Sequence, residues 1–465
     1  MRLLVLSIVM LACSLSAQAQ LQLTPEGGEF RVNSATASDQ DTPRVSCSAQ
    51  TGGCIVVWKS GESGNQGIFA QRYDATGAAM GGLLHVADDE RAATVGTSEL
   101  GEFVVAWDRD AGTEWQVVSR GFDADGTPIT STPSTVYSAS RTQGDQVIGC
   151  NDNHFCIIVW DDQGAAVRAR RLLLNGLAMG NQIEVAPIDN VEQAFPAVAV
   201  SNSGRFMIVW HVLSPDSEGL DESRVMARTF APSGNPEGTA FEVARTRNQF
   251  GDPAGLGITI DDNTETFIVT WDSQLHADST LQFQPRPGEI FVQRIDGPNR
   301  TLLGAPILVA AIDPGLRQYH STVAASASGS FLVVWEDSQI NNNRERILGQ
   351  LYTAGGIASG AAQELSQPSQ GDRRDPSVSL KVDGKALVAW QGTDRGRDVY
   401  ARRFNLQEGA PVPTPTNAPP LPTSTPRQGG SNDDGCAITS NGSGSPATML
   451  LLCGATLLLV FRRRA

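Results

Sequence analysis

The sequence contains few of the residues and motifs from which most active sites are built. Only five of its 465 residues are histidine. It has no GxSxG, no HExxH, no phosphate-binding glycine loop and no run of the SxDxGxxW motifs that sialidases carry. Its carboxylates are scattered, so no acid and base can be paired from the sequence alone. No catalytic residue is predicted, and the sequence favours a protein that is not an enzyme.

Basic clusters are missing as well. The chain has 35 Lys and Arg against 50 Asp and Glu, a formal net charge of −15, and its one basic cluster is the arginines at 462–464. Because binding to a phosphate backbone needs clustered Lys and Arg, nucleic acid is excluded as a partner.

Long hydrophobic runs occur only at the two ends of the chain. At the N-terminus, Arg2 precedes an apolar run at 3–15, and small residues at Ala17 and Ala19 follow it. Thirteen residues at about 1.5 Å each give a helix of only roughly 20 Å, short of the roughly 30 Å of a bilayer core. Residues 1–19 are therefore predicted to be a cleaved signal peptide.

The C-terminal run, at 447–461, is followed at once by the three arginines, which predicts a membrane helix whose end stays in the cytoplasm. Before it lies PVPTPTNAPPLPTSTP, an extended stalk of roughly 50 Å because proline fixes the backbone. We divide this part into a stalk at 406–435 and a tail at 436–465.

The tail resembles the C-terminal sorting tails of Gram-negative surface proteins, in which a Gly/Cys motif precedes a short apolar helix and an arginine cluster. The resemblance implies that Cys436 is a processing or lipid-attachment point. An uncleaved single-span anchor is the alternative. Either way the protein is expected to be exported to the cell surface or outer envelope, where it is anchored by the tail or released after processing.

Seven tryptophans share one context, four apolar residues followed by Trp, as in CIVVWKS and FLVVWED. Motifs that recur at intervals of tens of residues are typical of propellers and arrays. The tryptophans at the centres of the units are Trp58, Trp107, Trp160, Trp210, Trp271, Trp335 and Trp390.

Each unit is predicted to contain four strands. The apolar run before Trp is typical of a strand buried on both faces. A shorter strand precedes it, a strand such as IFAQRYD follows it, and a fourth such as NQIEVA closes most units. Four strands are the content of one propeller blade.

The ends of the array decide between a ring and a linear arrangement. The seventh unit stops after its third strand at Phe404, whereas GGEFRVNS near the N-terminus is a spare fourth strand. If Glu29 to Asn33 completes the last unit, the ring closes. We therefore predict an all-β fold, a seven-bladed β-propeller at 27–405 whose last blade is completed by the N-terminal strand. A linear string of small β domains is the alternative, although units of about 50 residues bury little core alone.

The units resemble the FVVVW/AQRFD-type tandem repeats of large secreted bacterial proteins over nearly all of residues 27–405. The resemblance implies a surface protein and no single activity.

Four cysteines fall at matching places in the first and third units. Cys54 and Cys156 each lie four residues before the repeat Trp, and Cys47 and Cys150 lie in the partner strands. In an exported protein this register predicts two disulfides, Cys47 to Cys54 and Cys150 to Cys156. Metal binding by these cysteines is the alternative, without a nearby CxxC or His to support it.

The third strands carry a column that is always Gln or Arg, and we expect it to bridge blades through backbone carbonyls rather than to bind a ligand. Its members are Gln71, Arg120, Arg170, Arg228, Gln293, Gln350 and Arg402. The sequence DADG, with Asp123 and Asp125, lacks the spacing of an EF-hand and is predicted to be a turn.

The longest loops, between the second and third strands of units four and five, are the predicted ligand site, because propellers commonly carry function on this face. Their polar residues are Asp216, Glu218, Asp221, Glu222, Asp272, His276 and Asp278. No cofactor is expected, although these loops are compatible with a calcium ion. The predicted function is a non-enzymatic adhesion module for an extracellular glycan or protein. The alternative is a propeller hydrolase or lyase that acts on extracellular polysaccharide.

Overall fold

The computed structural model describes residues 21–408, except 64, 89–90, 141–143, 152–154, 163, 188–190, 216–220, 249–254, 274–287, 311–315, 340–343, 369–370, 382 and 395. The described residues form strands and contain no helix, so none that could cross a membrane. The predicted signal peptide, most of the stalk, and the tail with Cys436 lie outside them.

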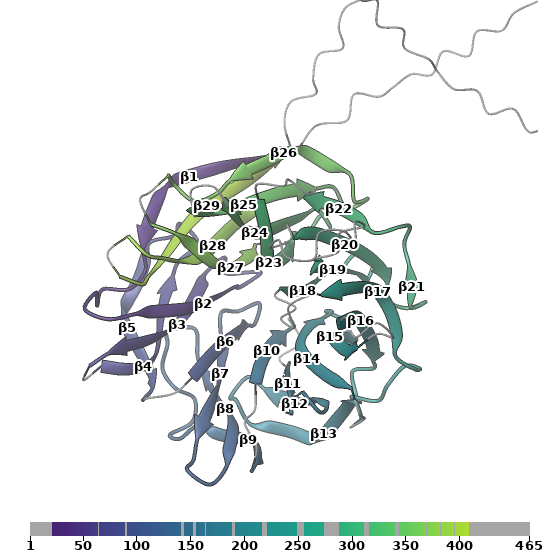
Figure 1. The fold of residues 1–465 in the computed structure, drawn as a ribbon. Helices are drawn as coiled ribbons and strands as arrows, with labels where there is room; N and C mark the ends of the chain where they lie inside the picture. Colours follow the sequence, from purple (N-terminus) through teal and green to yellow (C-terminus); the bar gives the residue numbers. More distant parts are fainter. Residues whose placement is uncertain are drawn as a thin grey trace, which may run out of the picture. The chain divides into compact units, whose positions relative to one another are not determined.

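Seven antiparallel sheets are arranged around one axis, as Figure 1 shows. This confirms the predicted seven-bladed β-propeller. The innermost strands are β2 (Gln40–Cys47), β6 (Arg91–Thr97), β10 (Gly144–Cys150), β14 (Glu192–Val200), β18 (Leu256–Asp261), β23 (Leu316–Ala325) and β27 (Arg373–Leu380).

The second strand of each blade carries the repeat tryptophan, fully buried between sheets. These strands are β3 (Cys54–Glu62), β7 (Phe103–Asp110), β11 (Phe155–Asp161), β15 (Phe206–Pro215), β19 (Thr266–Ser273), β24 (Phe331–Gln339) and β28 (Lys385–Gly392).

The two outer strands of each blade complete the sheet. The third strands are β4 (Asn65–Tyr73), β8 (Trp115–Phe122), β12 (Val167–Leu173), β16 (Asp221–Phe230), β20 (Glu289–Asp296), β25 (Arg344–Tyr352) and β29 (Asp398–Glu408). The outermost are β5 (Ala79–Ala87), β9 (Ser134–Ala139), β13 (Ala178–Ala186), β17 (Phe241–Asn248), β21 (Thr301–Leu302) with β22 (Ile307–Ala310), β26 (Ala358–Glu364) and β1 (Leu21–Arg31).

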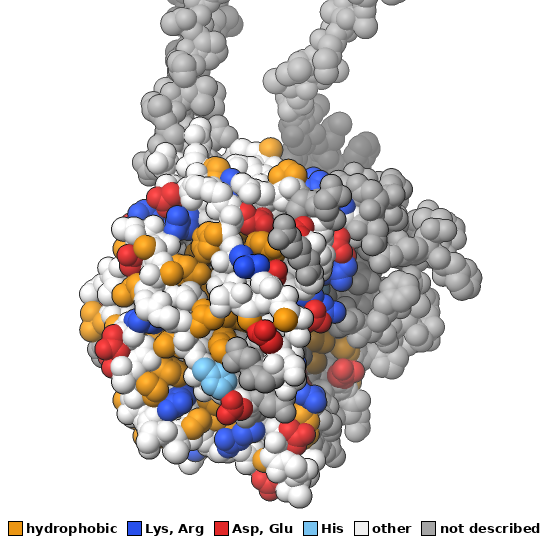
Figure 2. All heavy atoms as spheres, turned by 90° about the vertical axis from the view of Figure 1, so that its left-hand side faces the viewer, with side chains coloured by type: hydrophobic (Ala, Val, Ile, Leu, Met, Phe, Trp, Pro, Cys, Tyr) orange, Lys and Arg blue, Asp and Glu red, His pale blue; other side chains and the backbone are white. Residues whose placement is uncertain are grey.

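The core consists of seven buried clusters, one between each pair of neighbouring blades. The cluster between blades seven and one contains Trp58 and Val56 from β3 and Leu387 and Ala389 from β28. Burial of both faces of each sheet explains why the strand before Trp is apolar at successive positions. The outer surface in Figure 2 shows acidic and basic side chains interspersed, with hydrophobic side chains in small scattered groups.

The ring closes through the N-terminal strand, as predicted, but over a longer stretch. Strand β1 begins at Leu21 and pairs with β29 from Leu21 opposite Glu408 to Arg31 opposite Tyr400. The predicted residues Glu29 to Asn33 form the end of this contact. The residues of β1 before Gly27 include a proline and only one β-branched residue, Thr24, so the strand signal in the sequence is weak there.

Polar contacts seal this seam. The buried Glu29 carboxylate accepts a hydrogen bond from Arg373 at 2.9 Å, and Arg373 also contacts Asp394 at 2.6 Å. The Asn33 amide donates to Asp398 Oδ1 at 2.7 Å and accepts from the Val399 amide at 2.8 Å.

Candidate active site at the mouth of the axial cavity

A cavity of about 490 Å³ lies on the axis of the propeller. It is lined by residues of all seven inner strands and by Gly255, which directly precedes β18. Its wall is mixed, with valines and alanines along the strands and polar side chains near the strand starts, among them Arg44, Gln146, His320 and Asp375. A volume of this size falls within the range of small-molecule and sugar sites.

A β-bulge near the start of the inner strand is present in every blade except the fifth. At five of these bulges a residue other than glycine adopts positive φ, a conformation that L-residues rarely take. These residues are Thr42, Ala92, Phe195, His320 and Asp375. Strain of this kind concentrates at functional sites, and all five line the cavity.

The junction of blades six and seven brings a histidine and two carboxylates together. His320 Nδ1 lies 3.0 Å from Glu336 Oε2 and 3.6 Å from Asp375 Oδ1. The Asp375 amide donates a hydrogen bond to Glu336 Oε2 at 3.2 Å. The Glu336 side chain has no exposed surface, whereas His320 is 37% and Asp375 33% exposed. The buried glutamate thus orients the imidazole at the cavity wall.

Asp272, predicted from the loop of unit five, lies beside this junction. It occupies the end region of β19 and is buried, and its Oδ1 accepts a hydrogen bond from the Ser321 amide at 3.2 Å. Burial raises the pKa of Asp272 to about 7, against the opposing effects of the Ser321 hydrogen bond and the His320 charge.

The carboxylates also control the charge of His320. Burial alone would lower its pKa, but the hydrogen bond and charge of Glu336, followed by the charges of Asp375 and Asp272, raise the pKa to about 9. The neighbouring Tyr319 hydroxyl donates to Glu345 Oε1 at 3.0 Å, and burial together with the charge of Glu336 raises the pKa of Tyr319. Glu345 in turn forms an ion pair with Arg374.

The sequence contained a signal for part of this site that the loop argument missed. The residue directly after the repeat Trp is polar in every unit, and six of the seven are buried. They are Lys59, Asp108, Asp161, His211, Asp272, Glu336 and Gln391. Asp272 and Glu336 come from this column, and His320 and Asp375 occupy equivalent bulge positions on neighbouring inner strands.

The other predicted loop residues are not brought into this cluster by any described contact. Asp216, Glu218, His276 and Asp278 lie outside the described residues. Asp221 and Glu222 belong to β16, where they pair with Pro215 and Ser214. Much of the predicted loop of unit four is therefore a long strand hairpin.

Both predicted disulfides are present, between Cys47 and Cys54 and between Cys150 and Cys156, each with a Cα–Cα distance of 4.0 Å. Each pair occupies directly opposed positions of the first and second strands of its blade. The predicted turn at Asp123 is also observed, since Asp123 Oδ1 and Asp125 Oδ1 both accept from the Thr127 amide.

The Gln and Arg column bonds to backbone carbonyls, as predicted, but in the described part of the chain only three of its seven members bridge neighbouring blades. Arg170, Arg228 and Arg402 donate to backbone carbonyls of the preceding blade, at Val136, Val185 and Leu365. Arg120 and the three glutamines bond to carbonyls of their own blade.

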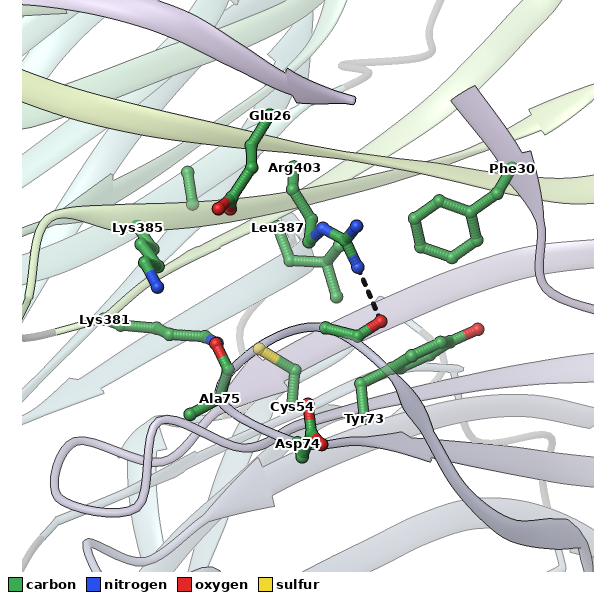
Figure 3. A pocket seen from close by; sticks show the side chains of 12 residues that line it. Glu26, Phe30, Cys54, Tyr73, Asp74, Ala75, Lys381, Lys385, Leu387 and Arg403 are labelled. Atoms are coloured by element: carbon green, nitrogen blue, oxygen red, sulfur yellow. Dashed lines mark hydrogen bonds between the residues drawn. The ribbon is translucent and has the colours of Figure 1, made fainter. Parts of the chain in front are cut away.

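A second pocket lies between blades seven and one, next to strand β1 of the ring closure. Figure 3 shows Lys381 and Lys385 on one side, Phe30 on the other, and Arg403 between them, donating to the Gly77 carbonyl at 2.5 Å. Its volume is about 10 Å³, room for about one water molecule and no sugar. It is part of the ring closure rather than a ligand site.

Comparison with known proteins supports the fold. No protein-family model matches the chain, and no curated protein matches it. Among solved structures, polysaccharide lyase Uly1 is 10% identical with a TM-score of 0.51, over 84% of this chain and 98% of that one. An ulvan lyase, described as a new family of polysaccharide lyase, is 9% identical with a TM-score of 0.50, over 83% and 96%. At such low identity these likenesses extend to the fold alone.

Proposed function

We propose that this protein is an exported enzyme that cleaves an acidic polysaccharide by β-elimination at the mouth of its axial cavity. The observation that carries the proposal is the position of His320, at the cavity wall, with its Nδ1 held by the buried Glu336. A carboxylate that fixes one imidazole nitrogen leaves the other nitrogen available for chemistry, as in other histidine-based sites.

The geometry favours elimination over hydrolysis. Glycosidases place two carboxyl groups on either side of the scissile bond. Here Glu336 has no exposed surface, so it cannot contact a sugar, and its Oε2 is already bonded to His320 and the Asp375 amide.

In elimination from a uronate, a base takes the proton from the carbon beside the carboxylate, a C=C bond forms as the C–O bond to the leaving sugar breaks, and the leaving oxygen takes up a proton. A positive charge near the carboxylate stabilises the charge of the intermediate. His320 on the cavity wall is the candidate base. Because its pKa is raised to about 9, it accepts the proton in its neutral fraction, which grows with pH. The exposed Arg44 is the candidate for the positive charge.

Two of the solved structures of similar fold support this substrate class, since one is a polysaccharide lyase and the other an ulvan lyase. The two disulfides fit an oxidising compartment, where such substrates occur. We further propose that the C-terminal tail anchors or releases the protein at the cell surface, which mass spectrometry of the mature C-terminus would resolve.

The test is an assay of the full-length exported protein on a panel of uronate-containing polysaccharides. An unsaturated uronate product, detected by ultraviolet absorbance, is expected from the native protein and from H85A, whose histidine lies on the outer strand β5. H320N should lose it, and asparagine tolerates the positive φ at this position.

Two other outcomes would overturn the proposal. New reducing ends without the unsaturated product would indicate a hydrolase. Glycan binding without any cleavage would support the non-enzymatic binding module, which the scarcity of catalytic motifs favours.

A further inference from the structure

The three ligand-type atoms at the junction of blades six and seven have the spacing of a metal site. One atom each from His320, Glu336 and Asp375 lies within 4.8 Å of the others. With metal–ligand bonds of about 2.1 Å, ligand atoms around a tetrahedral ion are about 3.4 Å apart. The distances from His320 Nδ1, 3.0 Å to Glu336 and 3.6 Å to Asp375, lie on either side of that value.

An independent observation concerns the second oxygen of Glu336. The residue is 0% exposed, and Oε1 has no hydrogen-bond partner among the described residues. A buried carboxylate oxygen without a partner costs free energy, and an ion or an ordered water is the usual explanation. Asp272 is 5% exposed, and its Oδ2 also has no hydrogen-bond partner among the described residues. Its Oδ1 accepts from the amide of Ser321, the residue after His320, which places this carboxylate beside the cluster.

The local charge also calls for a cation. Asp272, Glu336 and Asp375 contribute three carboxylates, and His320 is the one basic side chain with a described ion pair to them. By contrast, the equivalent bulge positions of blades one, two and four hold Thr42, Ala92 and Phe195, which offer neither carboxylate nor imidazole. Among the described bulge positions with positive φ, an imidazole and a carboxylate occur together only at the junction of blades six and seven, as His320 and Asp375.

We propose that His320, Glu336 and Asp375 bind one divalent transition-metal ion, with Zn²⁺ as the first expectation. Imidazole together with carboxylates suits Zn²⁺ and Mn²⁺, whereas Ca²⁺ takes six to eight oxygen ligands, more than the cluster offers. Three protein ligands leave a coordination position for water or substrate at the cavity. The inference involves the same residues as the proposed lyase site, where such an ion would supply positive charge for a uronate carboxylate, but it does not depend on that activity.

The test is direct binding to chelator-treated full-length protein, by isothermal titration with Zn²⁺, Mn²⁺ and Ca²⁺ and by metal analysis after dialysis. One Zn²⁺ per chain is expected, and E336Q and D375N should each weaken its binding by at least about 10-fold. H85A, which removes the exposed His85–Asp88 contact, is the matched control and should bind as the native protein does. Thermal unfolding of each variant verifies that it is folded.

The proposal is overturned if no stoichiometric Zn²⁺ binds, or if folded E336Q and D375N bind as tightly as H85A. Its failure is distinguishable from that of the lyase. Full cleavage by metal-free protein that binds no Zn²⁺ would refute the metal site alone, whereas Zn²⁺ binding without cleavage of any polysaccharide would refute the lyase alone.

Discussion

Two places in the ring contain a buried carboxylate, and they differ in how that carboxylate is paired. In blade seven, where β1 closes the ring, both oxygens of the buried Glu29 carboxylate have partners. Oε1 accepts from Arg373 at 2.9 Å, and Oε2 accepts from the Gln367 amide at 3.0 Å. At the junction of blades six and seven, Glu336 Oε2 is close to His320, but Glu336 Oε1 has no hydrogen-bond partner among the described residues. A buried carboxylate with both oxygens paired suits a structural closure, whereas a buried carboxylate oxygen without a partner is typical of a site that receives a ligand or an ion.

The largest expected effect comes from breaking the seam. R373A should destabilise the protein by about 3–5 kcal/mol, because it leaves Glu29 charged and buried without its partner. Urea unfolding of the full-length protein measures the change. A loss below about 1 kcal/mol would mean that the Glu29–Arg373 pair contributes little to the closure of the ring.

The buried His211 should make the stability of the protein depend on pH, unlike the always-charged Arg373. Burial lowers its pKa to about 4. Below a pH of about 6.5, His211 therefore becomes protonated in the unfolded chain but stays neutral in the folded protein, which lowers the stability of the fold. This group should remove about 3 kcal/mol of stability between pH 7 and pH 4. The difference in pH dependence between the native protein and H211Q isolates it, and identical dependences would contradict the assignment.

The disulfides should contribute less than the seam. Replacing Cys47 and Cys54 together by alanine should lower the free energy of unfolding by about 2–3 kcal/mol, the chain-entropy estimate for so short a loop. Unfolding curves of the native protein and the double variant, both without reductant so that Cys150–Cys156 stays intact, check the value. Equal stability of the two proteins would argue against this stapling.

The smallest effect is expected at the candidate site. E336Q removes a buried charge without changing the volume, and the amide oxygen can still accept from His320 and the Asp375 amide. Stability should therefore change by less than about 1 kcal/mol. A loss comparable to that of R373A would show that Glu29 and Glu336 are equally well compensated, and the contrast between them would fail.

The fold was predictable from the sequence because one local pattern repeats seven times. The strand before each Trp, the strand after it and the spare N-terminal strand together specify the blades and their closure, and the matching places of Cys47 and Cys150 specify the disulfides. These features depend on local periodicity and on register, both of which the sequence displays directly.

The site was predictable only in part. Asp272 was named because it follows a repeat Trp and begins a long loop. His320, Glu336 and Asp375 were not, because they meet only when the inner strands of blades six and seven pack side by side and their bulges turn two side chains to the cavity. Comparing the units position by position would have singled out Glu336, but not its distance from the other two residues.

The most direct test of the account is the cleavage of acidic polysaccharide by native protein, H320N and H85A at matched, folded concentrations. The account predicts an unsaturated uronate product from the native protein and H85A and a loss of at least about 100-fold in H320N. Equal product from H320N and H85A would show that the junction of blades six and seven is not where the chemistry takes place.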